Sequence, residues 1–124
     1  MSQAVIGQFE QLVLTAILAL GERAYGVTIH DSAGRLAAPK TISLGAIYAT
    51  LDRLEEKGFI ESWLSDPTPE RGGRSKRHYR LQAAGERALR ESVQTSKRVC
   101  ETVDGIWGGL DGTPLRHLKP AGQH

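Results

Sequence analysis

Apolar side chains recur at helical spacing from residue 8 to residue 20, and a glycine follows. The apolar positions of this segment are Phe9, Leu12, Val13, Ala16, Ile17 and Leu20. Their spacing predicts an α-helix over 8–20 that ends at Gly21. The other faces of this helix also carry apolar residues, at Val5, Leu14 and Leu18. Because a helix that is apolar nearly all round must be buried on more than one side, we expect its second side to contact another subunit.

A second, weaker helical pattern covers residues 25–37. Its apolar stripe consists of Ile29, Ala33, Leu36 and Ala37. Pro39 lies just past the predicted end, where the missing amide hydrogen of proline stops a helix from continuing. We therefore expect this helix to end before residue 39.

The third predicted helix has the clearest boundaries. Ser43 is a favourable N-cap residue, and Gly58 closes the segment. The apolar stripe between them consists of Leu44, Ile47, Leu51 and Leu54. The opposite face is formed by Ala46, Ala49, Thr50 and Arg53. Because these side chains are small or polar, they leave room for a partner molecule to approach the helix.

After residue 58 the pattern changes from that of a helix to that of a strand. Residues 59–65 and 77–81 are short segments rich in aromatic and branched side chains, which favours two β-strands. The segment between them is rich in glycine, proline and polar residues, so it predicts a long turn and not a buried element. Together these segments predict a hairpin with a long tip.

A last helix is predicted over residues 83–107. A stripe of mostly apolar residues runs along it at alternating steps of four and three, which is typical of the seam between paired helices. The stripe consists of Leu89, Val93, Ser96, Cys100, Val103 and Trp107. Charged residues occupy the remaining faces, so one narrow stripe is available to a partner. Glycines weaken the end of this helix, and we expect residues 111–124 to form a flexible tail.

The order of these elements predicts a mainly α fold with a small two-stranded antiparallel hairpin. It is the order of a winged helix-turn-helix, here followed by a C-terminal dimerisation helix. We place the winged helix-turn-helix domain at 6–82 and the dimerisation helix at 83–110. In this architecture the third helix enters the major groove of DNA and the hairpin follows the phosphate backbone.

The clustering of basic residues supports nucleic acid as the partner, whereas the net charge of the chain does not. The net charge of +2 is too small to imply DNA binding by itself. The hairpin tip and second strand, however, carry several basic residues and no acid from residue 71 to residue 80. These residues are Arg71, Arg74, Lys76, Arg77 and Arg80. Two adjacent glycines beside them allow the backbone to approach a phosphate, which the basic side chains neutralise.

Two motifs in this chain resemble those of PadR-family transcriptional regulators. The segment 44–60, LGAIYATLDRLEEKGFI, resembles the recognition helix of that family. The segment 73–81, GRSKRHYRL, with Ala84-Gly85 after it, resembles the wing and the turn into the last helix. Upstream, residues 14–20 and Tyr25-Gly26 match the opening helix and turn. The resemblance extends from about Phe9 to Leu89 and is fairly specific, because the two motifs occur in the right order and at the right separation.

The resemblance implies a homodimer built from the first and last helices that acts mostly as a repressor of nearby genes. Many members of the family release DNA when a small hydrophobic or phenolic ligand binds between the subunits. Two positions depart from the family pattern. Ala49 stands where a proline is usual, which bears on how the helix sits in the groove. Gln82 stands where threonine is common, which bears on the cap of the last helix.

We expect the third helix, the residues before it and the hairpin tip to contact double-stranded DNA. The candidate DNA-binding residues are Lys40, Thr41, Ser43, Ala46, Tyr48, Thr50, Arg53, Arg71, Gly73, Arg74, Lys76 and Arg77. Five of these have a plainer alternative. Ser43 serves first as an N-cap, Tyr48 is equally suited to the edge of the core, and Arg53 is more often an ordinary surface charge. Lys40 and Thr41 are more often solvated loop residues. Since a dimer presents two recognition helices, the operator should be pseudo-palindromic.

The first and last helices supply the predicted dimer interface. Its candidate residues are Phe9, Val13, Ile17, Leu89, Val93, Cys100, Val103 and Trp107. For Trp107 we favour an aromatic anchor in the seam; the alternative is that it lines a ligand pore between subunits, as tryptophans do in some members of the family. For Cys100 we favour a small buried apolar residue, with an oxidation-sensitive contact to its mate as the alternative.

Other classes of protein find little support. A single cysteine excludes an intramolecular disulfide and makes a reducing, cytoplasmic location the default. The longest apolar run is about half the length of a membrane-spanning helix. No metal-ligand spacing joins the histidines to Cys100, and we expect no cofactor. Phosphate-binding glycine loops, paired carboxylates and nucleophile elbows are missing, so we expect no enzyme. The remaining alternative is a winged-helix module for protein interaction, against which the polar wing argues.

Overall fold

The structure is a computed structural model that describes residues 5–65 and 75–111. The chain divides into two units, Met1–Arg90 and Glu91–His124. We call the first the winged-helix unit and the second the distal helix unit, and we describe each by itself. The predicted tail lies almost entirely outside the described residues.

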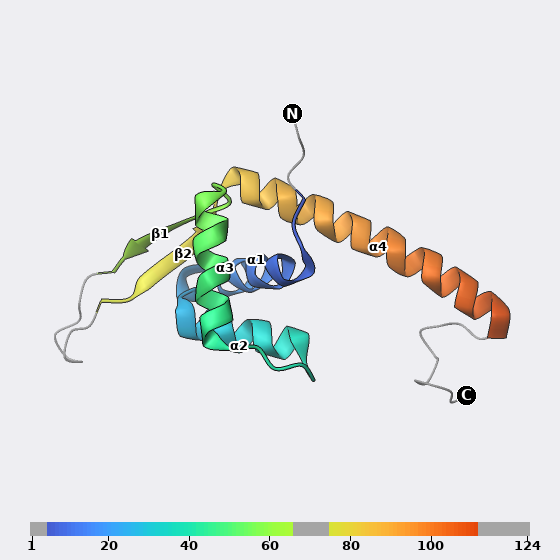
Figure 1. The fold of residues 1–124 in the computed structure, drawn as a ribbon. Coiled ribbons are helices and arrows are strands. Elements are labelled where there is room, and N and C mark those ends of the chain that lie inside the picture. Colours follow the sequence, from blue (N-terminus) through green and yellow to red (C-terminus); the bar gives the residue numbers. More distant parts are fainter. Residues whose placement is uncertain (1–4, 66–74, 112–124) are drawn as a thin grey trace. The chain divides into compact units, whose positions relative to one another are not determined.

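The winged-helix unit contains three α-helices and a two-stranded hairpin, as the sequence predicted (Figure 1). Its elements are α1 (Gln8–Leu20), the short 3-10 helix η1 (Gly21–Arg23), α2 (Gly26–Ala37), α3 (Leu44–Glu56), β1 (Ile60–Leu64) and β2 (Arg77–Leu81). In Figure 1, α3 lies across α1 and α2, and the hairpin extends from the C-terminal end of α3. The helix α4 (Ala83–Asp111) begins in this unit and continues through the glycines that were expected to weaken its end.

The predicted boundaries of α1 and α3 are confirmed, and each has a local cause. Gly21 ends α1 with a φ of 60°, and Gly58 follows α3 with a φ of 80°. These are left-handed conformations that glycine adopts without steric cost. At the start of α3, the Ser43 hydroxyl oxygen accepts a hydrogen bond of 3.0 Å from the amide of Ala46. Ser43 is therefore the N-cap of α3.

The hairpin pairs β1 with β2 in antiparallel register, with Ser62 opposite Tyr79 and Trp63 opposite His78. Its second strand has an additional partner that the sequence did not predict. Tyr25, between η1 and α2, forms a bridge with His78, and the Tyr79 amide donates a 3.0 Å hydrogen bond to the Ala24 carbonyl. The hairpin is thus fixed along β2 to the turn that precedes α2.

The core of the winged-helix unit draws on every helix and both strands. Its larger members are Val13, Leu14, Ile17, Ile29, Ile47, Leu51, Leu54, Phe59, Ile60, Tyr79 and Leu89. The first turn of α4 packs tightly here, since a side chain at Gly85 would lie 2.1 Å from the Phe59 carbonyl oxygen. Two apolar residues predicted to lie in buried stripes, Leu36 and Leu44, are instead exposed.

Three residues predicted for the dimer interface are buried inside the chain. Val13, Ile17 and Leu89 are almost fully covered within the winged-helix unit, so that assignment was wrong. The reason is that α1 packs against α2, α3 and β2, which leaves little of its apolar surface open. Of the residues on other faces of α1, Leu14 is buried as well, whereas Leu18 is 57% exposed.

In the distal helix unit, α4 carries exposed apolar side chains. Val93, Val99, Ile106 and Trp107 are exposed, and Val103 is half-buried. Cys100 is also exposed within the chain, so the chain itself does not bury it. Of the helices in the described ranges, none combines the length and hydrophobicity that a membrane span requires.

Candidate nucleic-acid interface

The N-terminal half of α3 presents a surface of small side chains. Gly45, Ala46 and Ala49 are exposed, and a side chain added at Gly45 would meet nothing within 4 Å. The exposed residues of the C-terminal half include Asp52 and Glu56, which would repel a phosphate backbone. Both the shape and the charge of α3 therefore favour its N-terminal half as the part that another molecule can approach.

The loop before α3 brings basic and hydroxyl groups to the same place. Lys40 and Thr41 are exposed, and both line a groove of about 590 Å³ together with Ser43 and Ala46. A ring nitrogen of His30 on α2 lies 2.6 Å from the Ile42 carbonyl oxygen, at hydrogen-bond distance. This contact fixes the loop to α2 and so places four predicted DNA-binding residues side by side.

Tyr48 contributes to this surface and is positioned by a glycine on another helix. Its side chain is 42% exposed, and its hydroxyl end lies against the first residue of α2, Gly26. A side chain built at Gly26 would stand 2.0 Å from the Tyr48 hydroxyl oxygen. The ring therefore occupies space that only a glycine leaves free. Tyr48 is partly exposed at the edge of the core, with its hydroxyl end against the buried Gly26.

Thr50 was predicted to face the partner molecule, and this was wrong. It is only 2% exposed, because steps of three and four residues place it on the same buried side of α3 as Ile47 and Leu54. Its hydroxyl oxygen accepts a 3.2 Å hydrogen bond from Arg53. Arg53 is half-exposed, and its Nε lies 4.0 Å from a carboxylate oxygen of Glu10. Arg53 is thus joined to α1 as well as to its own helix.

Glu10 is a buried carboxylate that connects α1 to the end of α3. It accepts a 2.8 Å hydrogen bond from Lys57 Nζ and a 3.0 Å hydrogen bond from the Gly7 amide. Burial raises the pKa of Glu10, but the two hydrogen bonds and the charges of Lys57 and Arg53 outweigh it, so the net pKa is lowered. Sequence reasoning missed this contact; the one available signal was an acid at a buried position of an apolar helix.

At the base of the wing, Lys76 and Arg77 are exposed. Lys76 Nζ lies 4.3 Å from the centre of the Tyr25 ring, a cation–π contact. Arg77 donates a 2.9 Å hydrogen bond to the Ser62 hydroxyl, which in turn donates to Glu55 on α3. The other predicted wing residues, Arg71, Gly73 and Arg74, lie outside the described residues.

The described residues contain no group of three His, Cys, Asp or Glu side chains that could hold a metal ion.

Arg80 has a different environment from the other basic residues of the hairpin. It forms an ion pair with Glu61 and lies over the Trp63 ring. Trp63 packs on the hairpin, where it stacks on His78.

Comparisons with known proteins identify a family and related proteins. A family model described as the transcriptional regulator PadR-like family matches residues 14–91. A protein of Lysinibacillus sphaericus named uncharacterised protein X is 28% identical over 110 residues, which cover 89% of this chain and 97% of that protein.

Two solved structures have the same fold. A PadR family transcription regulator from Clostridium difficile R20291 superposes with a TM-score of 0.67 and 24% identity, covering 82% of this chain and 100% of that one. A PadR-like transcription factor from Bacteroides fragilis gives a TM-score of 0.61 and 26% identity, covering 81% and 90%. The predicted fold class is therefore confirmed.

Proposed function

This chain belongs to the PadR-like family of transcriptional regulators, and from this premise we propose that it is a cytoplasmic homodimeric repressor that binds a pseudo-palindromic operator. The observation that carries the proposal is the open N-terminal half of α3. Small side chains there adjoin Lys40 and Thr41, and the basic residues Lys76 and Arg77 lie at the base of the wing. Because the family consists of transcriptional regulators, it gives no support for an enzyme activity.

The start of α3 is suited to a DNA phosphate. The Ser43 hydroxyl oxygen already accepts the Ala46 amide, so its own proton remains to be donated to a phosphate oxygen. The N-terminal end of a helix also stabilises a nearby anion through its free amides and its dipole. Lys40 and Thr41 beside it supply a positive charge and a second hydroxyl. We assign these three residues to phosphate contact, with the Tyr48 hydroxyl as a fourth group.

We assign contact with the DNA bases to the small side chains of α3. Ala46 is exposed and apolar, and such a side chain can contact the methyl group of thymine in the major groove. Gly45 and Ala49 allow the helix to lie deep in the groove. Because Glu10 and Thr50 hold Arg53, we assign Arg53 to the orientation of α3 and not to a base.

The wing would neutralise phosphates without reading sequence. Lys76 and Arg77 are exposed for this role, and we include Arg71, Gly73 and Arg74 from the part of the tip outside the described residues. Each phosphate contact raises affinity and steepens its dependence on salt.

The dimer is proposed to form through α4. Its exposed apolar residues Val93, Val99, Ile106 and Trp107 need a cover that the described chain does not provide. A second copy of α4 would bury them together with Val103 and Cys100. As the resemblance implies, a small hydrophobic or phenolic ligand between the subunits, beside Trp107, would release the DNA.

The proposal is tested by fluorescence anisotropy with a labelled duplex from upstream of the gene that encodes the protein, against a scrambled duplex. We expect the native duplex to bind about a thousandfold more tightly. Replacing Lys76 by alanine should weaken both duplexes and reduce the salt slope by about one. The matched control, Arg87→Ala, should leave the slope unchanged. Equal, salt-indifferent binding of both duplexes would overturn the proposal and favour a protein-interaction module.

A further inference from the structure

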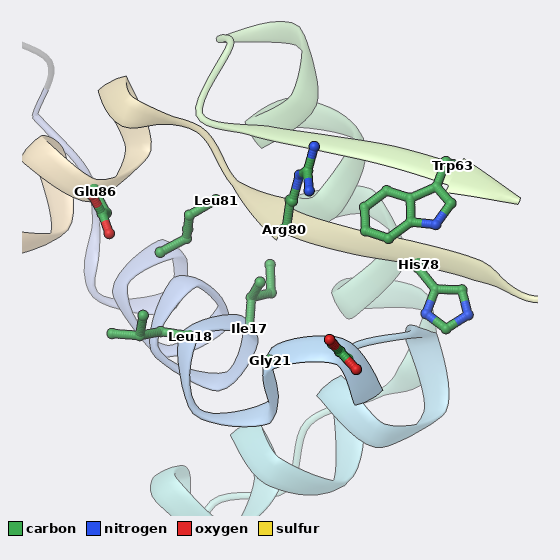
Figure 2. A pocket seen from close by; sticks show the side chains of 9 residues that line it. Ile17, Leu18, Gly21, Trp63, His78, Arg80, Leu81 and Glu86 are labelled. Atoms are coloured by element: carbon green, nitrogen blue, oxygen red, sulfur yellow. The ribbon is translucent and has the colours of Figure 1, made fainter. Parts of the chain in front are cut away.

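A pocket of about 550 Å³ lies beside the hairpin, within the winged-helix unit (Figure 2). Its apolar walls are Ile17 and Leu18 of α1 and Leu81 of β2. Figure 2 shows Trp63 and His78 at one end, with Arg80 between them and the apolar side chains. The volume is within the range of pockets that hold small organic molecules. No described residue that we assign to DNA contact lines the pocket, although Trp63 and His78 belong to the same hairpin as Lys76 and Arg77.

The charges around this pocket are unbalanced. Glu22 and Glu86 both line it, and neither carboxylate has an ion pair or hydrogen bond with the described part of the chain. Arg80 is the one lysine or arginine among the lining residues, and its charge is already paired with Glu61. The pocket thus combines an apolar interior and an aromatic wall with two carboxylates that lack a counter-charge.

A series of ring contacts connects the pocket to the base of the wing. The Trp63 ring stacks on His78 with centroids 5.6 Å apart, and Arg80 lies 5.3 Å from the same tryptophan ring. The rings of His78 and Tyr25 lie edge to face, with centroids 5.4 Å apart. Lys76 Nζ lies over the Tyr25 ring, 4.3 Å from its centroid. A molecule that moves Trp63 therefore acts on the contacts that position Lys76.

We propose that this pocket binds a planar aromatic molecule that carries a protonated amine, and that its occupation weakens DNA binding. The aromatic body would pack against Trp63 and the leucines, while the ammonium group pairs with one of the two lining carboxylates, Glu22 or Glu86. By competing with His78 and Arg80 for the tryptophan ring, the ligand loosens the series of contacts that ends at Lys76. The effect on DNA rests on the proposed function, whereas the binding site does not.

Isothermal titration calorimetry on the full chain tests the site with three matched probes: 1-naphthylmethylamine, neutral 1-naphthalenemethanol and the anion 1-naphthaleneacetate. We expect the amine to bind most tightly. The double variant Glu22→Gln/Glu86→Gln should weaken the amine about tenfold and leave the alcohol nearly unchanged. The variant Trp63→Ala should weaken both the amine and the alcohol. A Leu36→Ala control should change neither, since Leu36 is exposed on α2 and does not line the pocket.

Three results would overturn the site. If none of the probes binds, the pocket is covered, for example by a second copy of the chain. If the alcohol or the anion binds as tightly as the amine, the carboxylates do not select the ligand. If Trp63→Ala leaves the affinity for the amine unchanged, the probe occupies a different place. Because the two glutamates are at the rim and unpaired, their glutamine variants should fold even where Trp63→Ala does not.

The regulatory effect is measured by anisotropy on the native duplex with saturating 1-naphthylmethylamine. We expect the affinity for DNA to fall about fivefold or more for the wild type, and to stay unchanged for Glu22→Gln/Glu86→Gln. An unchanged wild-type affinity, with the probe bound by calorimetry, would overturn the regulatory effect alone. If the wild type binds neither duplex without the probe, the proposed function fails and the calorimetric result still decides the site.

Discussion

The winged-helix unit and the distal helix unit both carry apolar residues at helical spacing, but different partners must cover them. In α1, the stripe that contains Val13 and Ile17 is buried by other elements of the same unit. In the distal part of α4, Val99 and Ile106 are each more than half exposed, with no cover from the described chain. Helical periodicity therefore identifies the face that will be buried, but it does not identify the molecule that buries it.

We expect the largest effect from a substitution in the core of the winged-helix unit. Replacing the fully buried Leu14 by alanine should lower the free energy of unfolding by about 3 kcal/mol, because it leaves a cavity that the surroundings cannot fill. Leu18→Ala on the same helix is the matched control, since Leu18 is exposed, and it should change stability by less than about 0.5 kcal/mol. Urea denaturation followed by circular dichroism measures both. Equal losses would mean that the two leucines have the same environment.

The next effect addresses the uncovered stripe of α4. Val103→Glu should raise the dissociation constant of the dimer at least about tenfold, because burying an unpaired carboxylate is costly. The helix content should not change. Gln94→Glu adds the same charge at an exposed position away from the stripe and should leave the dimer intact. Sedimentation velocity over a dilution series compares the two, and equal behaviour would remove this stripe from the interface.

A smaller effect concerns the contact between α1 and α3. Glu10→Gln should cost about 1 kcal/mol at neutral pH, since the amide loses the charge-assisted hydrogen bond with Lys57. The folded state lowers the pKa of Glu10 from 4.5. The wild type should therefore hold this stability above pH 4.5 and lose it as the pH falls through the folded pKa.

Unfolding experiments between neutral pH and pH 3 should show the difference between Glu10→Gln and wild type shrinking as the pH falls. Glu56→Gln, which changes an exposed carboxylate, serves as the control and should show no such trend. A constant difference across the series would mean that Glu10 contributes by packing and not by its charge.

The smallest effect concerns the DNA-binding surface. Gly26→Ala should push the Tyr48 ring away from α2. Operator affinity should then fall about threefold, because the Tyr48 hydroxyl would lose one modest hydrogen bond to DNA. Gly34→Ala on the same helix should have no effect, because a side chain there meets nothing within 4 Å. Anisotropy measures both variants. If Gly26→Ala binds like the wild type, the Tyr48 hydroxyl makes no important contact with DNA.

The parts of the fold that were predictable from the sequence have local causes. Gly21, Ser43 and Gly58 mark helix boundaries through conformations and hydrogen bonds that involve only neighbouring residues. The contacts that were missed join distant parts of the chain. Glu10 meets Lys57 across 47 residues, and no short pattern encodes that pairing.

The errors in the candidate site and the dimer interface have other origins. Thr50 is polar, so the sequence favoured an exposed position, although its place on α3 turns it towards the core. Leu89 continues the stripe of α4, but it belongs to the first turns, which pack inside the winged-helix unit. Lys40, Thr41 and Ser43, which precede or cap α3, line one groove because they are close in sequence, and their contact with DNA stays a prediction.

The most direct test of the account is the mass of the complex with the native duplex, measured by sedimentation equilibrium. We predict two chains per duplex with no stable complex of one chain, because in the proposed dimer the uncovered apolar residues of α4 join two winged-helix units that each present one α3. Val103→Glu should bind the same duplex only weakly. A wild-type complex that contains a single chain at full affinity would contradict the account.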